Sequence, residues 1–261
     1  MAPKKLADTE IPILRMAQGR ISFAVIGTTP FIFNRMSSKV KMGLLAGTQK
    51  KTAAEKQAHV KHDPVNEFRD SVYRNKGGDR ATRLTFPAPA FKGAMLTAAL
   101  DMPNTRRTEI GRRVWVEGLS VDVYGTPELL MSVVRSSDIN RTPDIRTRAI
   151  LPQWACVVSV NFVEPLMNAT AVGHLMAAAG VIAGVGDFRQ EKGKGNYGQF
   201  RLSDADDPEF RAIVANGGRV VQDEALEHYR CYDDETQELL TWYDAEVKRT
   251  GRKPKESTRD A

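Results

Sequence analysis

Residues 169–202 read A-T-A-V-G-H-L-M-A-A-A-G-V-I-A-G-V-G-D-F-R-Q-E-K-G-K-G-N-Y-G-Q-F-R-L, and this stretch decides the fold. Its first part is apolar and rich in small residues, which predicts a packed helix over Ala169–Ile182. Asn168 or Thr170 can cap the start of that helix. Gln199–Leu202 is typical of a short strand. The stretch therefore predicts a helix, a glycine-rich loop and a strand in succession.

The loop within residues 183–201 carries five glycines and four Lys or Arg residues. Glycine lets the backbone approach a ligand at positive φ, so that N–H groups can point at phosphate oxygens. Arg189, Lys192 and Lys194 add positive charge. No Ser or Thr follows any Gly-Lys pair, and the G-x-G follows a helix instead of a strand, which disfavours a nucleoside triphosphate or NAD. A hairpin turn with solvated charges is the alternative interpretation.

Outside this stretch, strand-like runs alternate with helix-like runs. Ile21–Ile26 and Trp154–Phe162 predict strands, Pro89–Leu100 predicts a helix that begins at a proline, and Val114–Tyr124 alternates as a strand does. Leu129–Val134 can form a further strand that pairs with Val114–Tyr124 across the turn Gly125-Thr126-Pro127. The resulting order of strand, helix, strand, strand, helix, strand is typical of the ferredoxin-like fold. We therefore expect an α+β protein with an antiparallel sheet and helices on one face.

The same fold occurs in RRM-like RNA-binding domains, whose open sheet face carries exposed aromatic side chains. A run like R-G-F-G-F-V-x-F, which is typical of such sheets, is missing from this sequence. A standard base-stacking sheet is therefore disfavoured.

A polar and basic insertion follows the first predicted strand and is assigned to residues 34–85. Residues 34–63 have the composition of a mobile segment, and a helix is expected over Val65–Arg74. Further along, the segment 135–148 contains four arginines and no apolar periodicity. We expect it to be a loop with exposed arginines.

The C-terminal part of the chain differs from the rest in composition. Residues 1–203 are assigned to the ferredoxin-like domain, and residues 204–250 to an acidic helical appendage with a helix over Glu224–Lys248. Residues 251–261 are expected to form a basic, flexible tail.

The distribution of charge indicates a polyanionic partner. The net charge of the whole chain is +6, and it divides into +12 over residues 1–203, −10 over 204–246 and +4 over 247–261. A basic body usually binds polyanions. The acidic segment either solvates the surface or covers the basic face when the polyanion is absent.

Composition excludes several other classes of protein. With 261 residues and 41% hydrophobic content, the chain can bury a sizeable core. No run approaches the length of a membrane span, and the N-terminus lacks the apolar segment of a signal peptide, so we expect a cytoplasmic protein. Cys156 and Cys231 have neither metal-ligand spacing nor a disulfide framework. We expect no metal and no cofactor.

A second segment, Phe86–Met95, reads F-P-A-P-A-F-K-G-A-M. It resembles the hydrophobic-Pro-small-small-x-hydrophobic-Lys-Gly helix opening of the RAMP superfamily, whose members build CRISPR effector complexes. The V-G-D-F-R, K-G-K-G and Q-F-R runs of the loop resemble the glycine-rich loop of the same superfamily, which also follows a small-residue helix and precedes the last strand. The two motifs occur in the family's order, and the resemblance covers residues 21–203.

Within that superfamily the sequence is similar to the backbone subunit that polymerises along a guide RNA, or to a phage or prophage relative of it. The resemblance implies that Lys92 and Gly93 contact the RNA backbone and that the glycine-rich loop cradles it. It also implies that residues 34–63 extend as a thumb or finger between nucleotides. Other subunits of an effector complex are then further partners.

Basic residues elsewhere complete a predicted site for single-stranded nucleic acid, held through phosphates with little base preference. The predicted contacts are Arg35, Lys39, Lys41, Lys92, Gly93, Arg146, Arg148, Gly184, Gly186, Arg189, Lys192, Gly193, Lys194, Gly195, Asn196 and Tyr197. Tyr197, Phe188 and Phe31 are also candidates for stacking on bases, although an aromatic residue beside a glycine turn is more often a core anchor.

These observations favour a non-catalytic RNA-binding subunit that assembles head to tail along a guide RNA. Two alternatives remain. One is a single-stranded DNA-binding or annealing protein of phage type. The other is a metal-independent ribonuclease in which His59 and His62 serve as weak candidate catalytic residues, one as a general base.

Overall fold

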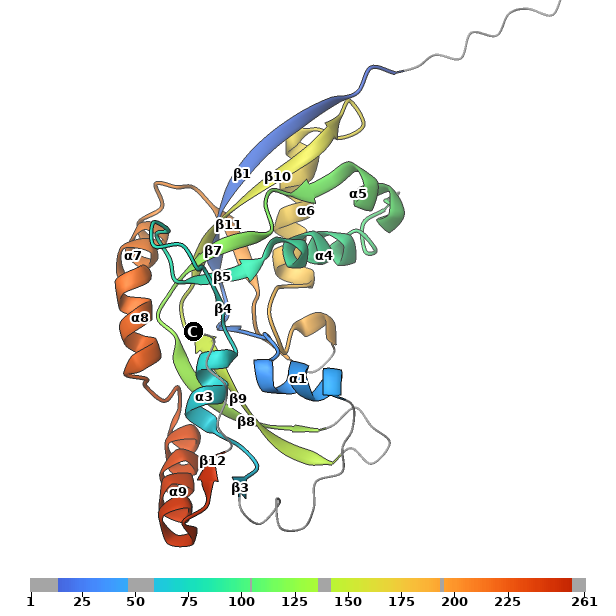
Figure 1. Cartoon of the computed structure of the whole chain (residues 1–261). Helices are drawn as coiled ribbons and strands as arrows, with labels where there is room; N and C mark the ends of the chain where they lie inside the picture. Colours follow the sequence, from blue (N-terminus) through green and yellow to red (C-terminus); the bar gives the residue numbers. More distant parts are fainter. Residues whose placement is uncertain (1–13, 47–58, 104, 136–141, 193–194, 255–261) are drawn as a thin grey trace, which may run out of the picture.

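The structure is a computed structural model, and it describes residues 14–46, 59–103, 105–135, 142–192 and 195–254. Within these ranges the chain forms a large antiparallel sheet, a second sheet of three strands and a set of helices around both (Figure 1). In the part of the chain that is described, no helix is long and apolar enough to cross a membrane.

The large sheet has the strand order β11-β1-β10-β7-β5-β4, with β6 also paired to β10. Its strands are β1 (Ala17–Gly27), β4 (Tyr73–Arg74), β5 (Leu84–Pro87), β6 (Val114–Val116), β7 (Ser120–Tyr124), β10 (Ala155–Glu164) and β11 (Phe200–Ser203). Helices α4 (Ala88–Ala98) and α6 (Ala169–Ile182) complete the chain order β1, α4, β7, β10, α6, β11. In chain order the four strands of this unit are β1, β7, β10 and β11. Across the sheet they occur as β11-β1-β10-β7, that is, the fourth, first, third and second strand. This arrangement confirms the predicted ferredoxin-like α+β fold.

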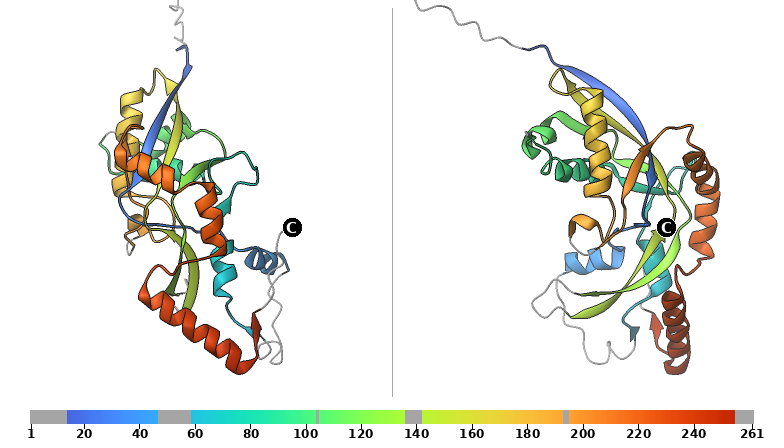
Figure 2. Two further views of the ribbon diagram at one scale, coloured as in Figure 1. Left: turned by 90° about the vertical axis from the view of Figure 1, so that its left-hand side faces the viewer. Right: turned by 180° about the vertical axis from the view of Figure 1, so that it is seen from behind.

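Helices α4 and α6 pack together on one face of this sheet (Figure 2). Alternate residues of β10 face them, and Val158, Val160 and Phe162 are buried there. Helix α6 begins where the sequence predicts, because the Asn168 side chain accepts a hydrogen bond from the Ala171 N–H at 2.8 Å. The predicted small-residue helix therefore has its predicted bounds.

The opposite face of the large sheet is partly covered by the C-terminal appendage. Helix α7 (Pro208–Asn216) places Phe210 and Ile213 against Ala24 and Ala155. The acidic segment therefore begins by closing one end of the sheet face that RRM-like domains leave open.

The second sheet is built from β2 (Phe31–Ile32), β9 (Pro143–Leu151) and β8 (Glu128–Arg135), in the order β2-β9-β8. The predicted pairing of Leu129–Val134 with the strand before it is wrong. Gly125, at φ +139°, turns the chain away, and β8 pairs with β9 instead. Residues 143–148, predicted as loop, are strand, so Arg146 and Arg148, two residues apart, lie on the same face of a sheet.

The predicted strand over Val114–Tyr124 is broken in two. Gly118, at φ +76°, separates β6 from β7, and only β7 runs on to pair with β5. A short helix that the sequence did not predict, α5 (Arg107–Arg113), precedes β6.

The basic insertion is only partly separate from the core. It contains α1 (Ser38–Ala46), β3 (His59–Val60) and α3 (Pro64–Asp70), while residues 47–58 lie outside the described part. Phe68 of α3 and Val72 are buried in the main hydrophobic cluster. The helix predicted to reach Arg74 ends at Asp70, because Tyr73 and Arg74 pair with β5.

The acidic segment holds three helices where one was predicted over Glu224–Lys248. They are α7, α8 (Arg219–Glu227) and α9 (Asp234–Thr250). Between α8 and α9 the chain pairs with β8, since the Leu129 N–H donates to Arg230 and the Tyr232 N–H donates to Leu129. Leu226 and Leu240 join the main core. The start of the predicted tail forms β12 (Lys253–Pro254) against β3, and residues 255–261 lie outside the described part.

Candidate nucleic-acid interface

The glycine-rich loop is folded against its own backbone, which corrects its interpretation as an open phosphate cradle. The N–H groups of Gly184, Val185, Asp187 and Gly198 donate to carbonyl oxygens within the chain at 2.8–2.9 Å. A Cβ on Gly198 would lie 1.7 Å from the carbonyl oxygen of Val185. These glycines are required for close backbone packing and positive φ, and their N–H groups are already used.

The other predicted loop residues are closely packed, exposed or outside the described part of the chain. Gly186, at φ +95°, packs against Phe31 and the carbonyl of Ile32, and a Cβ on Gly195 would collide with the carbonyl of Phe188. Asn196 is exposed. The structure does not describe Gly193, Lys194 or the side chain of Lys192.

One face of the second sheet gathers several predicted residues. Residues that lie directly opposite in an antiparallel pair share a face, and the register pairs Leu130 with Arg148 and Ser132 with Arg146. Ile32 and Ile150, also a register pair, share this face and form a buried floor together with Leu130. We call this surface the arginine face of the second sheet. The other face of the sheet packs against the core that contains Phe68, Leu129 and Ala149.

Two half-buried tyrosines flank the floor of the arginine face. Tyr197 comes from the glycine-rich loop and Tyr232 from the segment between α8 and α9, and both pack against the cluster of Ile32, Leu130 and Ile150. The pKa of Tyr232 is raised by burial, and Tyr197 adds to this effect. Tyr197 was predicted as a site residue, whereas Tyr232 was not. No pattern around Tyr232 signals its position, because only the pairing with β8 brings it here.

Arg146 and Arg148 differ in their freedom to bind a ligand. Arg146 is exposed. Arg148 is largely buried, its Nη1 donates to the Arg35 carbonyl at 3.0 Å, and its Nη2 lies 3.8 Å from a carboxylate oxygen of Asp187. Burial lowers the pKa of Arg148, and Asp187 partly offsets that effect. Its Nε is buried and makes no hydrogen bond within the described residues. Arg148 therefore fixes the loop to β9, while Arg146 is free to meet a phosphate.

The other predicted cations near this face are partly occupied. Arg35 donates from Nη1 to the Asp70 carbonyl at 2.9 Å. Arg189 lies 2.7 Å from Glu191 in an ion pair whose side chains are 21% and 13% exposed. Lys41 is exposed on α1, and the side chain of Lys39 lies outside the described residues. Positive charge that a ligand can reach is thus carried by Arg146 and Lys41 more than by Arg189.

Lys92 and Gly93 lie on the other layer of the molecule, on α4. The Lys92 Nζ donates to the Gly111 carbonyl at 2.9 Å and so holds the end of α5. A Cβ on Gly93 would meet no atom within 4 Å. The structure brings neither residue into the arginine face.

Phe31 and Phe188, the other two candidates for stacking on bases, differ in exposure. Phe31 is 1% exposed and its ring meets Phe33 and Phe86 edge to face, so it is a core residue and not a stacking one. Phe188 is 42% exposed, adopts φ +53° and accepts a backbone hydrogen bond from Tyr197. Phe188 therefore remains a candidate next to Tyr197.

His62 is held between two carboxylates. Its Nδ1 lies 3.0 Å from Glu67 and its Nε2 lies 2.9 Å from Asp144. The hydrogen bond to Glu67 raises the pKa of His62, burial opposes that effect, and Asp144 adds to the increase. A ring with a carboxylate at each nitrogen favours the protonated form, which cannot accept a proton as a general base. The side chain of His59 lies outside the described residues.

The uncovered part of the large sheet is a poorer surface for nucleic acid. Its side chains include an ion pair of Arg20 with Glu117 at 2.7 Å and a hydrogen bond between the Ser22 and Ser159 hydroxyls. Trp115 is half-buried there, opposite Asn161. The single arginine among these residues is neutralised by its partner, so this surface offers little attraction for phosphates.

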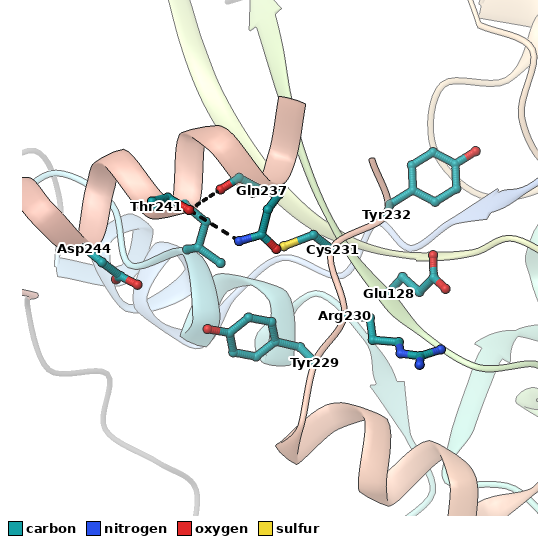
Figure 3. A pocket seen from close by; sticks show the side chains of 9 residues that line it. Glu128, Tyr229, Arg230, Cys231, Tyr232, Gln237, Thr241 and Asp244 are labelled. Atoms are coloured by element: carbon teal, nitrogen blue, oxygen red, sulfur yellow. Dashed lines mark hydrogen bonds between the residues drawn. The ribbon is translucent and has the colours of Figure 1, made fainter. Parts of the chain in front are cut away.

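A pocket of about 570 Å³ adjoins the arginine face, because Tyr232 and Glu128, which lies opposite Ile150, both line it (Figure 3). Glu128, Arg230 and Asp244 give it two carboxylates and one guanidinium. Gln237 and Thr241 hydrogen-bond to each other at 3.3 Å. Excess negative charge disfavours a phosphate in this pocket. Among the described residues, no group of three His, Cys, Asp or Glu side chains could hold a metal ion.

No protein-family model and no curated protein matches the sequence. Among solved structures, the fold is similar to the crystal structure of Cmr6 from Pyrococcus furiosus. The two chains are 11% identical and superpose with a TM-score of 0.35, over 72% of this chain and 99% of that chain.

Proposed function

We propose that this protein binds single-stranded nucleic acid, with RNA favoured, on the arginine face of the second sheet. The observation that carries the proposal is that Tyr197 and Tyr232 flank one sheet face that also presents Arg146. Aromatic rings that stack on bases, next to cations that meet phosphates, are the two components of single-strand binding sites.

Binding of this kind has little base preference, because every base has a face on which a ring can stack. Phosphate contacts release counterions, so the affinity falls as salt rises. The net charge of +12 over residues 1–203 attracts a polyanion to the whole body of the protein. The aromatic pair then places the strand on the second sheet and not elsewhere on the basic body.

We further propose that the protein is not an enzyme and acts as a backbone subunit that assembles head to tail along a guide RNA. The RAMP-like motifs at Phe86–Met95 and in the glycine-rich loop support this role, as does the ferredoxin-like order of the strands. Other subunits of a CRISPR effector complex are the further partners that this role implies. The position of His62 between Glu67 and Asp144 speaks against its use as a general base.

Fluorescence anisotropy with labelled oligouridine and oligodeoxythymidine of equal length tests the binding proposal. We expect binding of both strands that weakens steeply between 50 and 200 mM salt, with the RNA bound more tightly. A Tyr197→Leu, Tyr232→Leu double variant should bind both strands more weakly while unfolding at the wild-type temperature. Unchanged affinity in the folded double variant would contradict the placement of the site.

Incubation of the protein with structured RNA in EDTA tests the absence of catalysis. We expect the RNA to remain intact. Cleavage that is lost in a His59→Ala, His62→Ala double variant would establish the ribonuclease instead. Preference for DNA, with annealing of complementary strands, would favour the phage-type alternative.

A further inference from the structure

The outer face of helix α9 carries an exposed tryptophan among carboxylates. Trp242 is 65% exposed, and Glu235 and Glu238 lie one to two turns before it on the same stripe of the helix. This stripe lies opposite Leu240, through which α9 packs on the core. Neither Glu235 nor Glu238 forms an ion pair with any described residue. Tryptophan is the residue type most enriched at the energetic centres of protein interfaces.

Helix α5 carries a complementary surface of opposite charge. Arg107 and Arg112 are exposed on it, and the exposed Arg106, directly before the helix, is 3.9 Å from the single carboxylate of the helix, Glu109. Arg107 and Arg112 form no ion pair with a described residue. Guanidinium groups pair with carboxylates and stack on tryptophan rings, so Glu235, Glu238 and Trp242 provide what these arginines bind.

The two helices lie at opposite ends of the molecule. Helix α5 lies near the end formed by the start of β1, and α9 lies at the far end beyond the second sheet, in all three views (Figures 1 and 2). They therefore cannot contact each other within one chain. Complementary surfaces at opposite ends of one protein generate a heterologous contact between copies, which repeats into an open chain when its rotation does not close.

We infer that the outer face of α9 of one copy docks on α5 of the next copy, with Trp242 between Arg107 and Arg112. The inference rests on the head-to-tail assembly proposed above and names the surfaces that form it. It also explains the acidic segment, because the negative charge concentrated after residue 203 then meets the basic body of a neighbour and not that of its own chain.

A charge-reversal experiment tests this contact. One full-length variant carries Glu235→Lys and Glu238→Lys, and a second carries Arg107→Glu and Arg112→Glu. In each variant alone, α5 and α9 have charge of the same sign, so the contact is repelled. In an equimolar mixture every α9 can meet an α5 of opposite sign. The readout is mass photometry on a 60-nucleotide oligouridine.

We expect each variant alone to need at least about tenfold more protein than the wild type to fill the long strand, and the mixture to recover assembly. Trp242→Ala should weaken assembly in the same direction. A matched control, Glu224→Lys with Glu227→Lys, makes the same change in net charge on exposed residues of α8 and should assemble as the wild type does.

Binding to an oligouridine long enough for one copy separates this inference from the proposed function. If the variants bind the short strand within about twofold of the wild type but the mixture does not recover assembly, the α5–α9 contact is wrong and the binding proposal stands. If the wild type does not bind the short strand, the proposed function fails. Assembly by each variant alone at the wild-type concentration would also overturn the contact.

Discussion

Tyr197 and Tyr232 pack against the same buried cluster of the second sheet, which consists of Ile32, Leu130 and Ile150. One tyrosine belongs to the glycine-rich loop and the other to the acidic segment, so two parts of the chain with opposite charge meet over one sheet face. Because the floor between them is apolar and buried, both rings have a fixed position. Fixed aromatic rings lose little entropy when a base stacks on them.

Removal of either ring should weaken binding without unfolding the protein. Replacement of Tyr197 or Tyr232 by leucine keeps the contact with the apolar floor and removes the ring. We expect a loss of about 1–3 kcal/mol per stacked base, or roughly five- to 150-fold in affinity, by anisotropy with oligouridine. Trp115→Leu on the open face of the large sheet is the matched control. A larger effect of the Trp115 variant would place the strand on the other sheet.

Arg146 and Arg148 should respond differently to substitution. Arg146 is exposed, so Arg146→Ala should leave stability unchanged and reduce the slope of log affinity against log salt by about one phosphate contact. Arg148→Met removes the hydrogen bond to Arg35 and the ion pair with Asp187 of the glycine-rich loop, and should lower the free energy of unfolding by about 1–3 kcal/mol in urea. An Arg148 variant with unchanged stability would show that the guanidinium does not hold the loop to β9.

The two glycines at Gly93 and Gly198 have opposite expected effects. Gly198 has φ +72° and no room for a Cβ, so Gly198→Ala should destabilise the protein by at least about 2 kcal/mol. Gly93 lies in helix α4 with open space around it, and Gly93→Ala should raise the free energy of unfolding by about 1 kcal/mol. Both are measured by urea denaturation.

The same Gly93 variant also tests the contact implied by the RAMP resemblance. Since α4 lies away from the arginine face, we expect Gly93→Ala and Lys92→Gln to bind oligouridine as the wild type does. A loss of affinity in folded Lys92→Gln and Gly93→Ala variants would show that the strand also runs over the start of α4.

Part of the fold could be predicted from sequence, and particular residues show why the rest could not. The order β1, α4, β7, β10, α6, β11 follows from local periodicity and from the cap at Asn168, which need no distant contact. The strand β9 was missed although D-I-R-T-R-A-I-L alternates, because its arginines resembled those of a loop. Of the predicted site, Arg146 and Tyr197 lie on the same face of the second sheet, whereas Lys92 lies on α4. Tyr232 depends on the pairing of residues 230–232 with β8, which is a tertiary contact without a local signal.

The hydrogen bonds of His62 to two carboxylates predict that the stability of the protein depends on pH. The hydrogen bond to Glu67 raises the pKa of His62 in the folded protein above its unfolded value near 6.5, and Lys61, Asp144 and Tyr243 surround the same segment. Protonated His62 therefore makes its full contribution to the free energy of unfolding below about pH 6. This contribution is lost as the pH rises through the pKa that His62 has in the folded protein. Urea denaturation from pH 5.5 to 8.5 should show this decrease, and His62→Gln should remove it. An unchanged pH profile in the variant would assign the dependence to another group.

The position of the bound strand is tested most directly by photocrosslinking. The full-length protein is mixed with single-stranded RNA that carries 4-thiouridine, irradiated, digested and examined by mass spectrometry. We predict crosslinks at Tyr197 and Tyr232, which lie on the arginine face of the second sheet, and their loss above the salt concentration that releases the RNA. Crosslinks confined to Trp115 or to helix α4, with none at either tyrosine, would contradict the account.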